Sequence, residues 1–170
     1  MKPKGQGVTD RFYSKAQSLV VNACVNGAKP VITDWSETSY FVTVDRVAFF
    51  IIPKDKFCLM EKFYIPCDKL YLTENTYLCE IYGSKFSEAH PTGNQTRDNF
   101  TGQTVIDFET LYGPRYLDAE KLLTFPKQRL YCMSKPDGPV FILTTLRVLL
   151  GGIWPLKTKK TGNGYSNKDN

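Results

Sequence analysis

The side chains most able to do chemistry in this sequence are few and widely spaced. The chain has one histidine, His90, which precedes Pro91 in a polar stretch, so any Cys–His or Ser–His pair would have to use it there. The 5 cysteines form no CxxC or CxC pair, and no spacing typical of a zinc site occurs. Gly151-Gly152 is an isolated pair outside any phosphate-binding motif, and the carboxylates show no acid–base pairing. We therefore predict no catalytic residue, no metal site and no cofactor, and hence that the protein is not an enzyme.

The charge of the chain is concentrated towards its C-terminus. The net charge of the 170 residues is +5. Residues 1–110 contain 12 Lys+Arg and 13 Asp+Glu, whereas residues 111–170 contain 10 Lys+Arg and 4 Asp+Glu. This asymmetry favours a polyanionic partner, and a solvated basic tail explains it equally well.

Composition narrows the class of protein further. A hydrophobic share of 42% with 11 Phe and 10 Tyr is enough for a sizeable core. No apolar run approaches the ~18 residues of a membrane helix, and no signal-peptide pattern follows the basic N-terminus. The odd number of cysteines fits a reduced compartment. We expect a cytoplasmic α+β domain over residues 1–157, with a disordered polar tail at 158–170.

Hydrophobic periodicity predicts the elements that build this domain. In the first half, Asp10 is expected to cap a helix that ends near Asn26, and residues 40–44 and 47–52 form a β-hairpin. A second hairpin is expected over 70–82, followed by a polar loop at 83–102. In the second half we expect a strand at 104–108, a helix at Pro114–Leu123 and strands at 129–133, 139–143 and 146–156.

Three segments of the C-terminal half resemble a known family. They are Tyr116–Leu123 (YLDAEKLL), Gly138–Ile142 (GPVFI) and Gly151–Lys157 (GGIWPLK). Together they resemble the closing section of bacterial DNA polymerase sliding clamps, and residues 40–57 are similar to a stretch near the beginning of clamp domains. The resemblance implies a DNA-clamp-like fold of two β-α-β-β-β halves, here about residues 8–90 and 102–157. Two helices would then lie on one face of antiparallel sheets.

The same resemblance implies two kinds of site. The polar faces of the two helices would bind double-stranded DNA without reading its sequence, through Arg11, Lys15, Arg115 and Lys121. A partner-peptide pocket for replication proteins would lie beside the terminal segment, at Val140, Ile142, Pro155 and Leu156. Because a clamp subunit carries several such domains and this chain has room for one, we expect a homo-oligomer wherever a ring forms. The implied role is that of a replication processivity or accessory factor, such as a phage or mobile element carries.

Two other functions remain open from the residues themselves. Tyr71, Tyr77 and Tyr82, with Lys69 and Lys85 beside them, have the composition of a single-strand nucleic-acid-binding platform, although alternate aromatic residues on strands also build cores. The third hypothesis is a protein–protein adaptor without nucleic-acid affinity, in which the basic excess only keeps the tail soluble.

Overall fold

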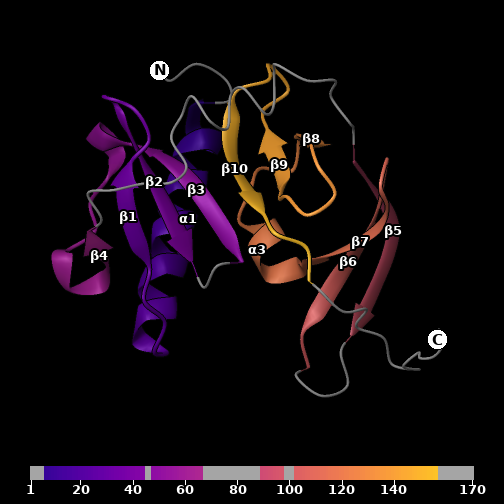
Figure 1. Ribbon diagram of the computed structural model, residues 1–170. Helices are drawn as coiled ribbons and strands as arrows, with labels where there is room; N and C mark the ends of the chain where they lie inside the picture. Colours follow the sequence, from indigo (N-terminus) through magenta and orange to yellow (C-terminus); the bar gives the residue numbers. More distant parts are fainter. Residues whose placement is uncertain (1–5, 45–46, 67–88, 98–101, 157–170) are drawn as a thin grey trace.

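The structure, a computed structural model, describes residues 6–44, 47–66, 89–97 and 102–156. It is an α+β protein with two helices and mostly antiparallel sheets in these ranges (Figure 1). The elements are α1 (Gln6–Val25), β1 (Val31–Asp34), β2 (Ser39–Val44), β3 (Ala48–Pro53), β4 (Ile65–Pro66), β5 (His90–Arg97), β6 (Thr104–Thr110), β7 (Gly113–Asp118), α3 (Ala119–Leu123), β8 (Leu130–Met133), β9 (Val140–Leu143) and β10 (Leu149–Ile153), with short 3-10 turns at Lys54–Lys56 and Glu61–Phe63.

Within the described ranges, the larger sheet has seven strands in the order β4-β1-β2-β3-β10-β9-β8. Strands β3 and β10 join its two halves as antiparallel neighbours, with Phe50 opposite Gly151 and Ala48 opposite Ile153. On each side of this junction, a helix is followed in the chain by three antiparallel strands: α1 by β1-β2-β3 and α3 by β8-β9-β10. The strand order is therefore mirrored about the β3–β10 pair.

Both helices contribute to one apolar core on one face of this sheet. Phe12, Ala16 and Val20 recur on the buried side of α1, as the helical period requires. The Phe12 ring stacks on that of Phe125, which follows α3, with their centroids 5.1 Å apart. It also meets the edge of Phe50 in β3, so the core is continuous across the junction.

The three-stranded sheet, in the order β5-β6-β7, lies beside the seven-stranded one in Figure 1. The β6–β7 hairpin pairs Thr110 with Gly113 at its turn and Val105 with Asp118 at its open end. Phe108 and Leu117 are fully buried and belong to the same core as the helices. The smaller sheet is thus packed onto the larger one by its apolar residues.

The helix predicted at Pro114–Leu123 is wrong over its first half. Gly113–Asp118 is strand β7, and the helix occupies only Ala119–Leu123, with Asp118 as its N-cap. Pro114 is compatible with a strand here because β7 is an edge strand among the strands that the structure describes, and the missing N–H is tolerated at an edge. Pairing with β6 outweighs the helical spacing of Tyr116 and Leu117.

Two further expectations need correction. The predicted polar loop contains strand β5 at His90–Arg97, which pairs with β6 around a bulge, so tertiary pairing overrides its polar composition. Helix α1 begins at Gln6, which places Asp10 inside the helix and not at its cap. The predicted hairpin over 70–82, with Tyr71, Tyr77 and Tyr82, and the tail at 158–170 lie outside the described residues.

Candidate binding pocket

A pocket with a volume of about 580 Å³ lies where the two sheets meet. Four segments that are distant in the sequence form it: the residue before β3, the start of β7, the β8–β9 turn and the segment after β10. Its walls are largely apolar and include three prolines and two large aromatic rings. The lining residues are Val47, Pro114, Arg115, Tyr116, Pro136, Asp137, Gly138, Trp154, Pro155 and Leu156.

Backbone hydrogen bonds fix the segment after β10 as one wall of this pocket. The Trp154 amide donates to the carbonyl of Val47 at 2.8 Å, and the Leu156 amide donates to the carbonyl of Tyr116 at 2.9 Å. The Trp154 ring also packs against Phe49 in β3, with the ring centroids 5.3 Å apart. The segment is therefore tied to the larger sheet at one end and to β7 at the other.

Arg115 holds the opposite wall in place. Its Nη1 donates to the carbonyls of Tyr112 and Pro114, at 3.1 Å and 2.9 Å, and its Nη2 donates to the carbonyl of Pro136 at 3.1 Å. The Tyr112 hydroxyl adds a bond of 2.9 Å to the carbonyl of Ser134. The start of β7 is thereby joined to the β8–β9 turn, and three backbone carbonyls fix the guanidinium of this lining residue.

The lining offers apolar contact together with one cation and one carboxylate. Arg115 supplies the cation, and the exposed Asp137 in the β8–β9 turn supplies the carboxylate. None of the other lining side chains is ionised at neutral pH, and Tyr116 adds a phenol. In the described ranges, no three His, Cys, Asp or Glu residues lie close enough together to hold a metal ion. Such a lining suits the binding of an apolar group whose orientation is set by a charged neighbour.

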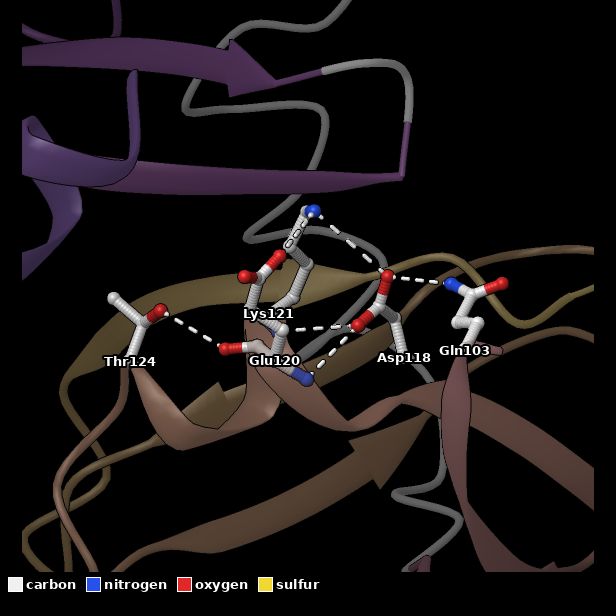
Figure 2. A network of polar contacts seen from close by, with 5 residues as sticks. All are labelled: Gln103, Asp118, Glu120, Lys121 and Thr124. Carbon is white, nitrogen blue, oxygen red and sulfur yellow. Dashed lines mark hydrogen bonds and ion pairs between the residues drawn. The ribbon is translucent and has the colours of Figure 1, made fainter. Parts of the chain in front are cut away.

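The structure separates the four residues predicted to contact DNA. Arg11 and Lys15 are exposed on α1. Arg115 lies on strand β7 and lines the pocket, because the helix predicted there does not form. Lys121 is on α3, but it is 9% exposed, and Figure 2 shows its ammonium group between Asp118 and Glu120. A shared helical face of all four cations is therefore absent.

The structure also divides the four residues predicted to form a peptide pocket. Pro155 and Leu156 line the pocket, whereas Val140 and Ile142 are fully buried in the core beneath the sheet. The sequence reasoning missed Trp154 and the Pro136–Gly138 turn as pocket walls. A tryptophan beside Pro155 at the end of a strand was the available signal for the first. No sequence signal brings Val47 to this place, because its position depends on the β3–β10 pairing.

Among the described residues, no helix has the length and hydropathy needed to cross a membrane. Comparison with family models, curated proteins and solved structures finds no match to this chain.

Proposed function

We propose that this protein is a non-enzymatic, clamp-like protein that binds a short apolar peptide segment of a partner protein in the pocket at Trp154–Leu156. The observation that carries the proposal is the pocket itself: about 580 Å³ of space, walled by apolar side chains and fixed by hydrogen bonds on two sides. Sites of this size and lining are typical of specific binding of small or short ligands. Extended peptides bind by placing one or two large side chains in such pockets.

The clamp-like part of the proposal is supported by the arrangement of the larger sheet. A helix followed by three antiparallel strands occurs twice, and the two units meet at β3 and β10 (Figure 1). Both helices bury their apolar sides in one core, and the Phe12–Phe125 stacking joins them. The resemblance to sliding clamps implies a partner-peptide pocket at Pro155 and Leu156, and the presence of both residues in the pocket lining supports the proposal.

A matched pair of leucine variants tests the pocket. Peptides are selected from a random displayed library on the immobilised full chain, and the affinity of the strongest binder is measured by fluorescence anisotropy. Leu156→Glu places a charge in the apolar lining and removes leucine contacts, so we expect at least about a tenfold loss of affinity. Leu146→Glu makes the same change at a side chain that is 86% exposed on the β9–β10 turn, outside the lining, and should leave affinity unchanged.

Thermal melting of both variants shows whether each is folded. Equal affinities for the two variants, with both folded, would place the peptide elsewhere and overturn the proposal. Failure of any peptide to bind the unaltered protein at millimolar concentration would do the same.

A second candidate function, contact with duplex DNA, is favoured by the exposed face of α1. Arg11, Ser14, Lys15, Ser18 and Asn22 are all exposed at helical spacing, and none of them carries a negative charge. Cations on such a face attract phosphates without reading sequence, and each phosphate contact steepens the salt dependence of binding.

Retention on duplex DNA at rising salt tests this function. We expect the double variant Arg11→Gln/Lys15→Gln to elute earlier and with a slope of log K against log salt that is shallower by about 2. The control Lys29→Gln/Lys127→Gln removes two exposed charges elsewhere and should keep the slope. Identical behaviour of the two double variants would exclude α1 as the DNA-binding face, and peptide binding without any DNA retention would identify the protein as an adaptor.

A further inference from the structure

We propose that the peptide recognised by this pocket carries an aspartate or glutamate beside its large apolar residue, and that Arg115 binds this carboxylate. The inference rests on the proposed function and specifies its ligand: an internal segment that combines one acidic side chain with one or two bulky apolar side chains. Four features of the pocket lead to it: the unused donors of Arg115, its apolar surroundings, the backbone groups of the lining and the position of Asp137.

Arg115 retains donors that the fold does not use. A guanidinium has five N–H donors. Two Nη1 bonds and one Nη2 bond go to backbone carbonyls, which leaves Nε–H and one Nη2–H without an acceptor among the described residues. The Nε and Nη2 edge of arginine is a geometry that carboxylates accept in a bidentate manner. Because the three carbonyls of Tyr112, Pro114 and Pro136 already fix the guanidinium, binding costs little side-chain entropy.

The apolar surroundings strengthen this interaction. Arg115 is half-buried and shares the lining with Tyr116, Trp154 and Leu156. Charge-assisted hydrogen bonds gain strength where apolar walls exclude water. An apolar side chain that fills the pocket would shield the pair, so the carboxylate is expected next to the bulky residue in the peptide.

The lining is poorly suited to a peptide C-terminus, the other source of a carboxylate. Terminal carboxylates are captured by groups of free backbone N–H donors. Of the ten lining residues, three are prolines with no N–H, and four others donate their N–H within the protein. The prolines are Pro114, Pro136 and Pro155, and the four donors are Val47 to Val44, Gly138 to Lys135, Trp154 to Val47 and Leu156 to Tyr116.

Asp137 limits the charge that the pocket accepts. Its exposed carboxylate is in the same turn as Pro136, whose carbonyl binds Arg115, and it forms no ion pair among the described residues. A second acidic residue on that side of the peptide would be repelled. The structure therefore favours a single acidic residue, placed on the Arg115 side of the apolar anchor.

An array of amide-capped hexapeptides tests the inference on the unaltered full chain. The peptides have Trp-Leu fixed at the centre, and each flanking position in turn carries Asp or its neutral isostere Asn. At one flanking position we expect Asp to bind about tenfold or more tightly than Asn, the difference typical of a hydrogen-bonded charged group. NMR supplies a direct readout, because the Nε–H resonance of Arg115 should shift with the Asp peptide and not with the Asn peptide.

Variants of Arg115 complete the test. Arg115→Gln should remove the preference for Asp, and Arg115→Lys should restore only part of it, since lysine keeps the charge without the bidentate geometry. Equal binding of Asp and Asn peptides at every position would overturn the inference while the proposed function stands. Tighter binding of a Trp-Leu peptide that ends in a free carboxylate than of every amide-capped Asp peptide would assign the site to a C-terminus. Absence of all binding would refute both.

Discussion

Replacement of Lys121 by methionine is expected to destabilise the fold and to leave DNA retention unchanged. The Lys121 ammonium lies 3.3 Å from Glu120 Oε1 and 3.8 Å from Asp118 Oδ2 (Figure 2). The lysine side chain is only 11% exposed and the Asp118 side chain 8% exposed, so the Lys121–Asp118 pair is shielded from solvent. Methionine keeps most of the aliphatic packing and removes the charge.

The expected loss of stability depends on the hydrogen bonds that Asp118 keeps in the Lys121→Met variant. Breaking a buried ion pair from one side costs about 3–5 kcal/mol when the remaining charge has no other partner. Asp118 still accepts from Gln103 Nε2 at 2.6 Å and from the amides of Glu120 and Lys121 at 2.9 Å and 3.4 Å. The Glu120 contact adds little because that side chain is 73% exposed. We therefore expect a loss of about 1–2 kcal/mol, or a fall in Tm of roughly 2–8 °C.

Urea denaturation of three variants provides the assay. Glu120→Gln removes the exposed partner and should change the free energy of unfolding by less than about 0.5 kcal/mol. Asp118→Ala removes the helix cap, the Gln103 bond and the buried carboxylate together, and should cost more than Lys121→Met. Unchanged stability of Lys121→Met combined with weaker retention on duplex DNA would refute this reasoning, because it would show that Lys121 serves an exposed phosphate-binding face.

Three further predictions concern the core and its pH dependence. Gly151→Ala should unfold the protein or lower its stability by about 3 kcal/mol or more, because a Cβ there overlaps the Phe49 carbonyl oxygen across the β3–β10 pair. Gly138→Ala is the thermal-melting control, because the new atom's tight contacts there are with the flexible Lys135 side chain. Gln17→Leu should cost about 1–2 kcal/mol in urea denaturation, because it leaves the Cys58 amide and the Lys56 carbonyl without the Gln17 side chain that bonds both. Burial, with added repulsion from Asp10 and Asp55, raises the pKa of Tyr13 above 10.0. The contribution of the Tyr13 hydroxyl to stability is therefore complete below pH 10 and is lost as the pH rises through the folded-state pKa. In urea denaturation between pH 9 and 11, Tyr13→Phe should lose less stability than the unaltered protein.

Much of the larger sheet is predictable from local pattern. The runs Tyr40–Val44 and Val47–Ile52 are rich in β-branched and aromatic residues, and both form strands of the expected hairpin. The apolar spacing of Phe12, Ala16 and Val20 likewise predicts α1. These elements form because their own apolar side chains are buried, and the spacing of those side chains can be read from the sequence.

The errors occur where pairing partners decide the structure. The Tyr116-Leu117 spacing fits a helix as well as a strand, and only the register with β6 selects the strand. His90–Arg97 has a polar composition without strand periodicity, yet it adds to β6 as an edge strand. Both errors concern the smaller sheet, where tertiary pairing prevails over local preference.

Dependence on tertiary strand pairing also limits how much of the pocket can be predicted from the sequence. The resemblance of the terminal segment predicts a partner-peptide pocket at Pro155 and Leu156, and these two residues are among those that line the pocket described above. The sequence predicts Arg115 on a DNA-facing helix, because a charged residue of a predicted helix is assigned to its polar side. Because β7 is a strand, the Arg115 side chain instead donates to the carbonyl of Pro136 and lines the pocket. The difference between helix and strand thus moves Arg115 from the predicted DNA-facing helix to the wall of the pocket.

Under the proposed function, peptide binding would be thermodynamically coupled to fixation of the terminal segment onto β7. Leu156 is held to β7 by its amide bond to Tyr116, while the facing wall is held by Arg115 through Pro136. A peptide that contacts both walls binds only when both are in place, so its free energy of binding adds to that of closing the segment onto β7. At a ligand concentration of 100 times Kd this contribution is about 2.7 kcal/mol. The proposed function therefore predicts that bound peptide holds the segment after β10 more firmly against β7.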